Sequence, residues 1–549
     1  MTNSFRRGSI SLFLLISLAS VAFGAPGGTV SGVVKDSAGS PFKGAFVRAN
    51  KGKMTTTVLS DRDGRYRLDS LAPGDYRVRV TAAGYKSDEP KDLKVAAGRT
   101  ASLDFALHKD AVRWSDLSVY QGSKLLPDTK GKDLLFGRCL ACHGFQTRMA
   151  SAPRTEAGWK AGVKYMTEME HYFLSPTFTD QNAADVTSYL NVAFGIDSKL
   201  PKSPADLPGY RDVTQNFSDE AMKIVYVDYD LPGPNRFPWS GYPDKKGQIW
   251  IPYYGRADRI ARLDPKTGEV QEFKTPFQGT AGIHSAVPAP DGSVWFSEQG
   301  SNRLGKWDSA TQAITEYQHS YIPGKEGTTA GGSRHTVRID PKGNVWSTGS
   351  PLSRFDPTTG KFTDFPEVPT AYGIEIDPLG NVWFTEFVET GKLGKVNATT
   401  GEVTKYALPT AKAYPRRLVI DPQGYVWVAE YRGGKIARFD TRNETFQEFS
   451  LPGGSPTPYG IALDRNKFIW YSSMDMDTIA RLDPSTGAIL EFPFLYPENG
   501  IREFLPDSEG RMWFATGPNN KVGYFIPYGD TGPGPKSASG IEVELPFRR

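Results

Sequence analysis

The sequence predicts a mainly β multidomain protein with an N-terminal β-sandwich, a small all-α domain and a C-terminal seven-bladed β-propeller. Three patterns in its 549 residues predict this order: short alternating runs broken by turns, then helical spacing, then a tryptophan unit that repeats almost to the end. The length suits several domains of about 150 residues each. A charged fraction of 23% and a hydrophobic fraction of 38% are typical of globular proteins.

Residues 1–25 are expected to be an export signal and not part of the fold. Arg6 and Arg7 precede an apolar run from Ile10 to Phe23, and small residues follow where cleavage would occur. An uncleaved membrane anchor is the alternative, although the run is short for a span of ~20 residues. We therefore expect a periplasmic or secreted protein with no transmembrane segment after cleavage.

Residues 26–109 are expected to form the sandwich, because strand-like runs such as Tyr76 to Val80 alternate with turns at this spacing. The segments Gly64-Arg65-Tyr66, Leu71 to Tyr76 and Ala83-Gly84-Tyr85 resemble the carboxypeptidase regulatory-like domain. The resemblance implies a transthyretin-like sandwich used for spacing or adhesion. The segment contains no recognisable catalytic set.

Residues 110–196 change to helical spacing. A first helix is predicted from Lys132 to Cys142, a second from Glu156 to Tyr172, and a third that begins at the cap Thr179-Asp180. Residues 197–220 are rich in Pro, Ser and Lys, a composition that predicts a linker. The small all-α domain is therefore placed between the sandwich and the repeats.

The only two cysteines of the chain stand in the run Cys139-Leu140-Ala141-Cys142-His143. Thiols at this spacing add to both vinyl groups of one haem, and the adjacent histidine reaches the iron. A disulfide between the two cysteines is the alternative in an exported protein, but it leaves His143 unexplained. The motif predicts one covalent haem c, electron transfer and a periplasmic redox partner.

The same segment resembles the class I cytochrome c domain, with the motif helix first and Tyr189-Leu190 in a closing helix. The resemblance implies a six-coordinate iron with His143 on one side and a methionine on the other. Arg154 followed by Trp159, Val163 and Met166 is similar to the arrangement in cytochrome subunits of redox enzymes, which favours Met166. The candidates that follow the motif are Met149, Met166, Met169 and His171.

Residues 221–530 repeat one unit, and a tail of residues 531–549 follows them. A tryptophan recurs at Trp250, Trp295, Trp346, Trp383, Trp427, Trp470 and Trp513. Glycine stands three residues before each of them except Trp470, which has Lys467. Units of roughly 37 to 51 residues that contain only strands and turns are propeller blades. Seven tryptophans therefore predict seven blades.

Alignment of the blades on their tryptophans reveals two sets of positions. Eleven residues before each tryptophan lie Trp239, His284, His335, Tyr372, Arg416, Tyr459 and Arg502; three residues after it lie Tyr253, Glu298, Gly349, Glu386, Glu430, Ser473 and Thr516. Equivalent positions form circles around a propeller axis, so we expect a polar channel that binds a small molecule. In the alternative, the tyrosines only fill the channel, and the glutamates pair with Arg416 and Arg502.

The runs Asp291 to Glu298, Gly380 to Glu386 and Tyr459 to Asp464 resemble the virginiamycin B lyase family of streptogramin lyases. The resemblance implies elimination by a histidine base, with magnesium held near glutamate. His284 and Glu298 stand at the spacing of that pair, which makes them the candidate catalytic residues and Glu298 the candidate magnesium ligand. The family's further glutamate, two residues before the histidine, is Gly282 here.

Three hypotheses of function follow. In the first, the propeller binds or oxidises a small molecule and passes electrons to the haem. In the second, the propeller is a non-enzymatic binding platform; in the third, the chain is a streptogramin lyase-like carbon–oxygen lyase with an accessory haem. A net charge of +4 without a dense Lys/Arg tract gives no reason to expect a nucleic-acid partner.

Overall fold

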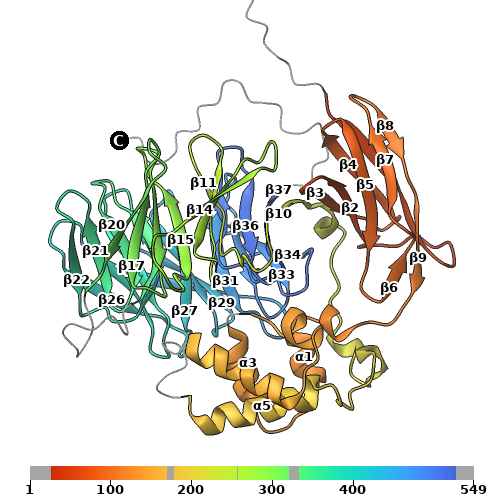
Figure 1. The fold of residues 1–549 in the computed structure, drawn as a ribbon, viewed down its shortest axis with the longest axis horizontal. Coiled ribbons are helices and arrows are strands. Elements are labelled where there is room, and N and C mark those ends of the chain that lie inside the picture. Colours follow the sequence, from red (N-terminus) through yellow and green to blue (C-terminus); the bar gives the residue numbers. More distant parts are fainter. Residues whose placement is uncertain (1–25, 142, 170–177, 256, 321–332, 527–549) are drawn as a thin grey trace, which may run out of the picture.

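The computed structural model describes residues 26–526 except 142, 170–177, 256 and 321–332 (Figure 1). The expected export signal and the C-terminal tail lie outside the described residues. The chain forms a sandwich beside a propeller, and a layer of helices covers one end of the propeller (Figure 1). Among the helices described, none is long and apolar enough to cross a membrane.

The N-terminal part is a β-sandwich, as the alternating pattern predicted. One sheet has the order β4-β1-β9-β6, with β8 also paired to β1, and the other contains β3, β2, β5 and β7 in that order. Val30, Leu68, Val78 and Phe105 fill the core between the sheets. The strands are β1 (Gly28–Asp36), β2 (Phe46–Lys51), β3 (Met54–Leu59), β4 (Arg65–Leu71), β5 (Gly74–Thr81), β6 (Tyr85–Ser87), β7 (Lys91–Val95), β8 (Thr100–Ser102) and β9 (Phe105–Lys109).

The C-terminal part is a β-propeller of seven four-stranded sheets, one for each aligned tryptophan. The innermost strands contact one another in order around the ring, and β35 returns to β11. The first three blades are β11 (Tyr242–Pro243), β12 (Ile249–Pro252), β13 (Arg259–Leu263) and β14 (Val270–Lys274); β15 (Ile283–Pro288), β16 (Val294–Glu298), β17 (Arg303–Trp307) and β18 (Ile314–Gln318); β19 (Arg334–Ile339), β20 (Val345–Gly349), β21 (Leu352–Asp356) and β22 (Lys361–Phe365).

The next three blades follow the same antiparallel order, and the last takes its outer strand from the start of the propeller sequence. They are β23 (Ala371–Ile376), β24 (Val382–Glu386), β25 (Lys392–Val396) and β26 (Val403–Ala407); β27 (Pro415–Ile420), β28 (Tyr425–Glu430), β29 (Lys435–Asp440) and β30 (Thr445–Ser450); β31 (Pro458–Leu463), β32 (Ile469–Ser473), β33 (Thr478–Leu482) and β34 (Ile489–Pro493). The last blade contains β35 (Leu505–Pro506), β36 (Met512–Thr516), β37 (Lys521–Ile526) and β10 (Val225–Asp230).

Strand β10 joins the propeller to the sandwich. One edge of β10 pairs with β37 and closes the ring, and its other edge pairs with β3 of the sandwich. The result is one continuous sheet in the order β35-β36-β37-β10-β3-β2-β5-β7. Backbone hydrogen bonds therefore fix the sandwich to the last blade, in addition to the chain that links them.

Each aligned tryptophan lies on the second strand of its blade and is buried. In six blades its indole N–H donates to an aspartate six residues earlier, for example Trp427 to Asp421 at 2.8 Å. That aspartate also accepts from the backbone amides of Gln423 and Tyr425, which fixes the turn between the first two strands. In the blade of Trp295 the aspartate position holds Ala289.

Residues 112–217 contain the helices, which form a layer against the propeller. They are α1 (Val119–Leu125), α2 (Lys132–Gly137), α3 (Glu156–Met169) and α5 (Asp180–Phe194). The first predicted helix is shorter than expected: α2 ends at Gly137, and Cys139–Ala141 form a 3-10 turn. The cap of α5 is as predicted, since the side chain of Thr179 accepts from the amide of Asn182.

Candidate functional site

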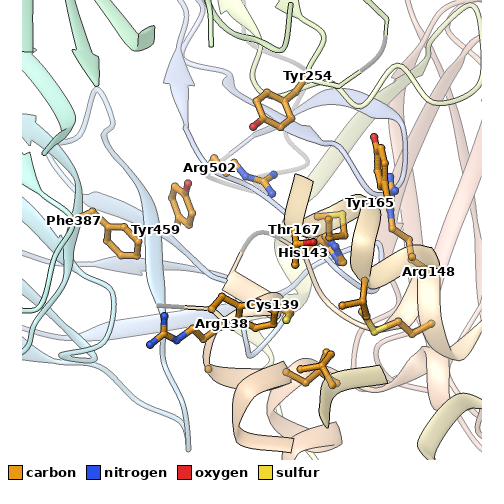
Figure 2. Close-up of a pocket in the computed structure, with 18 of the residues that line it drawn as sticks. Arg138, Cys139, His143, Arg148, Tyr165, Thr167, Tyr254, Phe387, Tyr459 and Arg502 are labelled. Atoms are coloured by element: carbon orange, nitrogen blue, oxygen red, sulfur yellow. The ribbon is translucent and has the colours of Figure 1, made fainter. Parts of the chain in front are cut away.

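A cavity of about 730 Å³ lies between the helical layer and the propeller, and its walls come from both (Figure 2). Apolar side chains of α3 and α5, among them Trp159, Val163 and Leu190, form much of the helical wall. The propeller wall includes side chains at the start of innermost strands, such as His335 and Tyr372, and others that follow second strands, such as Gln299. The site therefore joins segments that stand hundreds of residues apart in the sequence.

The cysteine motif opens onto this cavity. Cys139 and His143 both line it, and His143 is buried. His143 Nδ1 lies 2.7 Å from the carbonyl oxygen of Gly144 and 3.8 Å from Oε1 of Glu498. Burial lowers the pKa of His143 to about 4, so its imidazole is neutral, the form that binds metals. Cys142 lies outside the described residues.

Two of the four candidate iron ligands line the same cavity as His143. Met166 is half-buried on α3, and Met149 is buried in the turn Gln146–Ala150. His171 and the side chain of Met169 lie outside the described residues. The geometry thus leaves Met166 and Met149 as candidates to face His143.

The helical wall fits a haem. Haem needs a largely apolar pocket and polar partners for its carboxylates. The indole N–H of Trp159 is buried without a hydrogen-bond partner in the described part of the chain. The guanidinium of Arg154 lies 5.0 Å from the centre of the Trp159 ring, and both residues line the cavity. An unsatisfied donor beside a cation suits a carboxylate.

The residues eleven positions before each tryptophan meet around the propeller axis. Ring centres are 4.9 Å apart for Trp239 and His284, 3.6 Å for His284 and His335, and 4.5 Å for His335 and Tyr372. The guanidinium of Arg416 donates to the Tyr372 hydroxyl at 3.1 Å and lies 4.0 Å from the Tyr459 ring centre. These residues other than His284, together with Arg502, line the cavity.

The two histidines of this circle are neutral. Burial and the nearby positive charges lower the pKa of both His284 and His335 well below the ordinary value. His284 has no exposed surface and lies between the rings of Trp239 and His335. His284 is therefore shielded from the cavity by its neighbours, whereas His335 reaches it.

The residues three positions after each tryptophan do not line the cavity. Glu298 Oε2 accepts from Ser301 at 2.7 Å, and Glu386 pairs with Lys405 at 2.8 Å. Burial raises the pKa of Glu298 and of Glu430 to about 8. These glutamates end the second strand of a blade and face groups of the same blade, so Glu386 and Glu430 do not join Arg416 and Arg502 at the cavity.

The residue one position further along does face the cavity. Tyr254, Gln299 and Phe387, each four residues after its tryptophan, line it. Tyr431, at the same position of another blade, lies with its ring centre 4.1 Å from the guanidinium of Arg416. Side chains alternate between faces along a strand, so a shift of one position selects the other face. The sequence pattern alone does not single out these residues, although they stand one position beyond the aligned carboxylates.

Comparisons with known proteins agree with the two β parts. The model of the virginiamycin B lyase family matches residues 326–532, and the model of the carboxypeptidase regulatory-like domain matches residues 29–108. Neither range includes the helical layer. No curated protein sequence matches the chain. The predicted resemblances of the sandwich and of the propeller to these families are thus confirmed.

Solved structures of lyases share the propeller fold. A streptogramin B lyase is 23% identical, with a TM-score of 0.50, over 56% of this chain and 99% of its own. Virginiamycin B lyase from Staphylococcus aureus is 22% identical, with a TM-score of 0.48, over 55% of this chain and 98% of its own. A catalytically inactive variant of that lyase with quinupristin is 22% identical, with a TM-score of 0.47, over 55% of this chain and 98% of its own. At 23% identity, the likeness to the streptogramin B lyase establishes the β-propeller fold alone.

Proposed function

We propose that the chain binds a small molecule in the cavity between its propeller and its helical layer, and that a haem attached through Cys139 and Cys142 forms the helical side of this site. The observation that carries the proposal is that Cys139 and His143 line the same cavity as His335 and Arg416. A ligand on the propeller wall would lie against the haem, which favours oxidation of that ligand with transfer of electrons to a redox partner.

The residues of the helical wall have defined roles in this proposal. His143 is the iron ligand through Nε2, since its Nδ1 is next to the carbonyl of Gly144. Met166 is the favoured second ligand, with Met149 the alternative on the same cavity. When bound, haem supplies one-electron chemistry. The apolar side chains of α3 and α5 exclude water from it.

Attachment of haem is tested on the exported protein, produced in a bacterial host that matures c-type cytochromes. We expect the intact mass to exceed that of the processed polypeptide by one haem. The double variant Cys139→Ala/Cys142→Ala should have the mass of the polypeptide alone. A mass without haem for the unaltered chain would refute this part of the proposal.

The redox role is tested with the haem as reporter. The oxidised protein is mixed with small alcohols, amines and organic acids while its visible spectrum is recorded. Reduction of the haem by one of them, in a saturable manner, supports an oxidoreductase. Reduction only by a partner cytochrome or a chemical reductant supports a binding platform with a haem shuttle.

A lyase is the second candidate, favoured by the propeller fold and by the position of the His284 and Glu298 pair. Strands β15 and β16 pair Ile283 with Glu298, so the two residues lie on adjacent strands. Ile283 rather than His284 is the direct partner of Glu298, and the strand register shifts between Ile283 and Ala286. Gly282 takes a positive φ of 59°, a conformation that the glutamate found in the family would adopt only with strain.

Magnesium near Glu298 belongs to this second candidate. The ion prefers six oxygen ligands in octahedral geometry, and usually keeps several waters beside one or two protein carboxylates. Glu316 is the carboxylate that acts on Glu298 through its charge and a side-chain hydrogen bond, while within the described residues no group of three or more His, Cys, Asp or Glu side chains could hold a metal ion. Quinupristin turnover, followed by mass spectrometry with and without added magnesium, decides the point. Turnover that is lost in His284→Ala would establish the lyase.

A further inference from the structure

One corner of the propeller wall contains buried polar groups that lack hydrogen-bond partners in the part of the chain that the structure describes. They are the indole N–H of Trp239 and both the amide nitrogen and the amide oxygen of Gln299. Each of the two residues is 6% exposed, and both line the cavity. Buried polar groups in native proteins are almost always satisfied, so these groups indicate a ligand.

A guanidinium belongs to the same corner. Arg502 lies 3.8 Å from the centre of the Trp239 ring, and the Tyr254 ring centre is 4.1 Å from that of Trp239. The three polar side chains come from neighbouring blades, because β11 contacts both β15 and β35. Figure 2 shows Arg502 directed into the space between Tyr254 and His143. We call Trp239, Gln299 and Arg502 the Arg502 corner.

The charges around the cavity have one dominant sign. Its lining includes Arg138, Arg148, Arg154, Arg416, Arg432 and Arg502, while Glu389 is the acidic residue among the described lining residues. A concave site lined by one sign of charge concentrates ligands of the opposite sign. The cavity is therefore suited to an anion.

Flat rings surround the rest of the propeller wall. Tyr372, Tyr459 and Phe387 line the cavity, and the guanidinium of Arg416 lies 4.0 Å from the Tyr459 ring centre and 4.1 Å from that of Phe387. Aromatic side chains bind flat unsaturated groups by stacked or edge-on contact. A ligand anchored at the Arg502 corner would extend its apolar part over these rings.

We propose that the Arg502 corner binds the carboxylate of an aromatic organic acid, with the ring of the ligand against Tyr372, Tyr459 and Phe387. The planar guanidinium and two N–H donors match the two oxygens of a planar carboxylate. This inference rests on the proposed use of the cavity as the ligand site. A haem carboxylate is the other source of the same chemistry, and the experiment separates the two sources.

The test is calorimetric titration of the full chain with benzoate at low salt, with benzamide as the neutral analogue of the same shape. We expect benzoate to bind at least tenfold more tightly than benzamide. Gln299→Leu and Trp239→Phe should each weaken benzoate about tenfold, because each removes a donor to the carboxylate. Gln299→Leu should not lower the unfolding midpoint, because its amide group has no hydrogen bond to lose in the described structure.

Gln278→Leu is the matched control, since Gln278 is exposed, is not among the residues that line the cavity, and its side chain donates to the carbonyl of Pro276. Its affinity for benzoate should equal that of the unaltered chain. If benzoate binds only to Cys139→Ala/Cys142→Ala, a haem carboxylate occupies the corner in the mature protein, which also supports a carboxylate subsite. Equal affinity for benzoate and benzamide, or an unchanged affinity of Gln299→Leu for benzoate, overturns the proposed carboxylate subsite.

The test of the Arg502 corner is independent of the haem proposal. The intact mass reports attachment of haem without any benzoate, and the benzoate titration can be carried out on chains with or without haem. A chain that lacks haem but binds benzoate through Gln299 would keep the carboxylate subsite and discard the haem wall.

Discussion

Glu430 ends strand β28 with both carboxylate oxygens buried and without a hydrogen-bond partner in the described residues. Burial, and secondarily the negative charge of Glu448, raises its pKa from 4.5 to about 8. Between those pH values the folded chain holds a proton that the unfolded chain has lost, so stability falls as pH rises towards 8. Glu430 therefore destabilises the blade at alkaline pH.

Glu430→Gln should remove this pH dependence. At pH 8.5 the variant should be more stable by on the order of 1–2 kcal/mol, because the neutral amide avoids burial of a charge; near pH 4.5 the two proteins should have equal stability. Urea unfolding at both pH values measures the difference. Glu402→Gln, at an exposed position, is the control and should have no effect at either pH. A gain of the same size at both pH values would contradict the protonation argument.

At the residue scale, the sequence predicted half of the cavity's propeller wall. The alignment on tryptophans identified His335, Tyr372 and Arg502, because those positions lie on the innermost strand of a blade or shortly before it. Three residues after each tryptophan it selected carboxylates such as Glu298, which do not line the cavity, whereas Gln299, one residue further along, does. Burial without a hydrogen-bond partner singles out Gln299, and that property is visible only in the folded chain.

At the scale of the blade, an aspartate and a tryptophan hold the first two strands together. Asp421 accepts the indole N–H of Trp427 at 2.8 Å and the amides of Gln423 and Tyr425 at 2.9 Å. Asp421→Ala should cost about 2–3 kcal/mol of unfolding free energy, because it leaves buried donors unsatisfied. Thermal or urea unfolding of the full chain measures this loss.

A double-mutant cycle isolates the indole bond from the turn. Trp427→Phe removes the donor, so Asp421→Ala should cost less in that background than in the unaltered chain. The blade of Trp295, which has Ala289 instead of the aspartate, shows that a blade can form without this bond. Strictly additive losses would mean that the aspartate acts only through the turn amides.

The carboxylate of Asp477 helps to hold the helical layer to the propeller. Gln146 donates to Asp477 Oδ2 at 2.8 Å, and the amide of Tyr120 donates to the Asp475 carbonyl at 2.7 Å. Burial raises the pKa of Asp477 from 3.8 to about 7. Between these values the folded chain binds more protons than the unfolded chain, so the free energy that favours the folded arrangement around Asp477 falls as pH rises from about 4 to 7.

We expect the helical layer to open more readily at pH 8 than at pH 5.5. Hydrogen-exchange protection factors of α1 and α5 should fall over this range, while those of the central blades stay constant. Asp477→Asn removes the charge but keeps one oxygen, which can accept from only one of the backbone amides of Glu498 and Asn499; without the charge, the pH dependence should be reduced. Asp483→Asn, on an exposed turn, provides the comparison. Equal pH dependence in Asp477→Asn would assign the effect to another group.

At the scale of the whole molecule, local patterns predicted the order of the parts but not their assembly. The period of two in the sandwich and the repeated tryptophan unit predicted both β parts, which are as expected. Two features were not predicted: the single sheet that joins β3 to β10, and the cavity between the cysteine motif and the propeller. Both depend on contacts between residues far apart in sequence, and no local period encodes such contacts.

The shared sheet makes a prediction about the sandwich. Deletion of residues 26–109 exposes the edge of β10 that pairs with β3 through Thr55, Thr56 and Thr57. An unpaired strand edge recruits other chains. The shortened protein should therefore self-associate in size-exclusion chromatography with light scattering, and its propeller should unfold at a lower temperature than in the full chain.

A charge on the exposed edge separates this explanation from a general loss of stability. Val225, at the start of β10, packs against the sandwich core and becomes exposed by the deletion. Val225→Lys in the shortened chain should restore a monomer, since a lysine blocks edge-to-edge pairing. A shortened chain that is already monomeric, with an unchanged unfolding temperature, would mean that pairing with β3 does not stabilise the propeller. The pairing of β10 with β37 would then be sufficient, and the sandwich would be a spacer, as the resemblance implied.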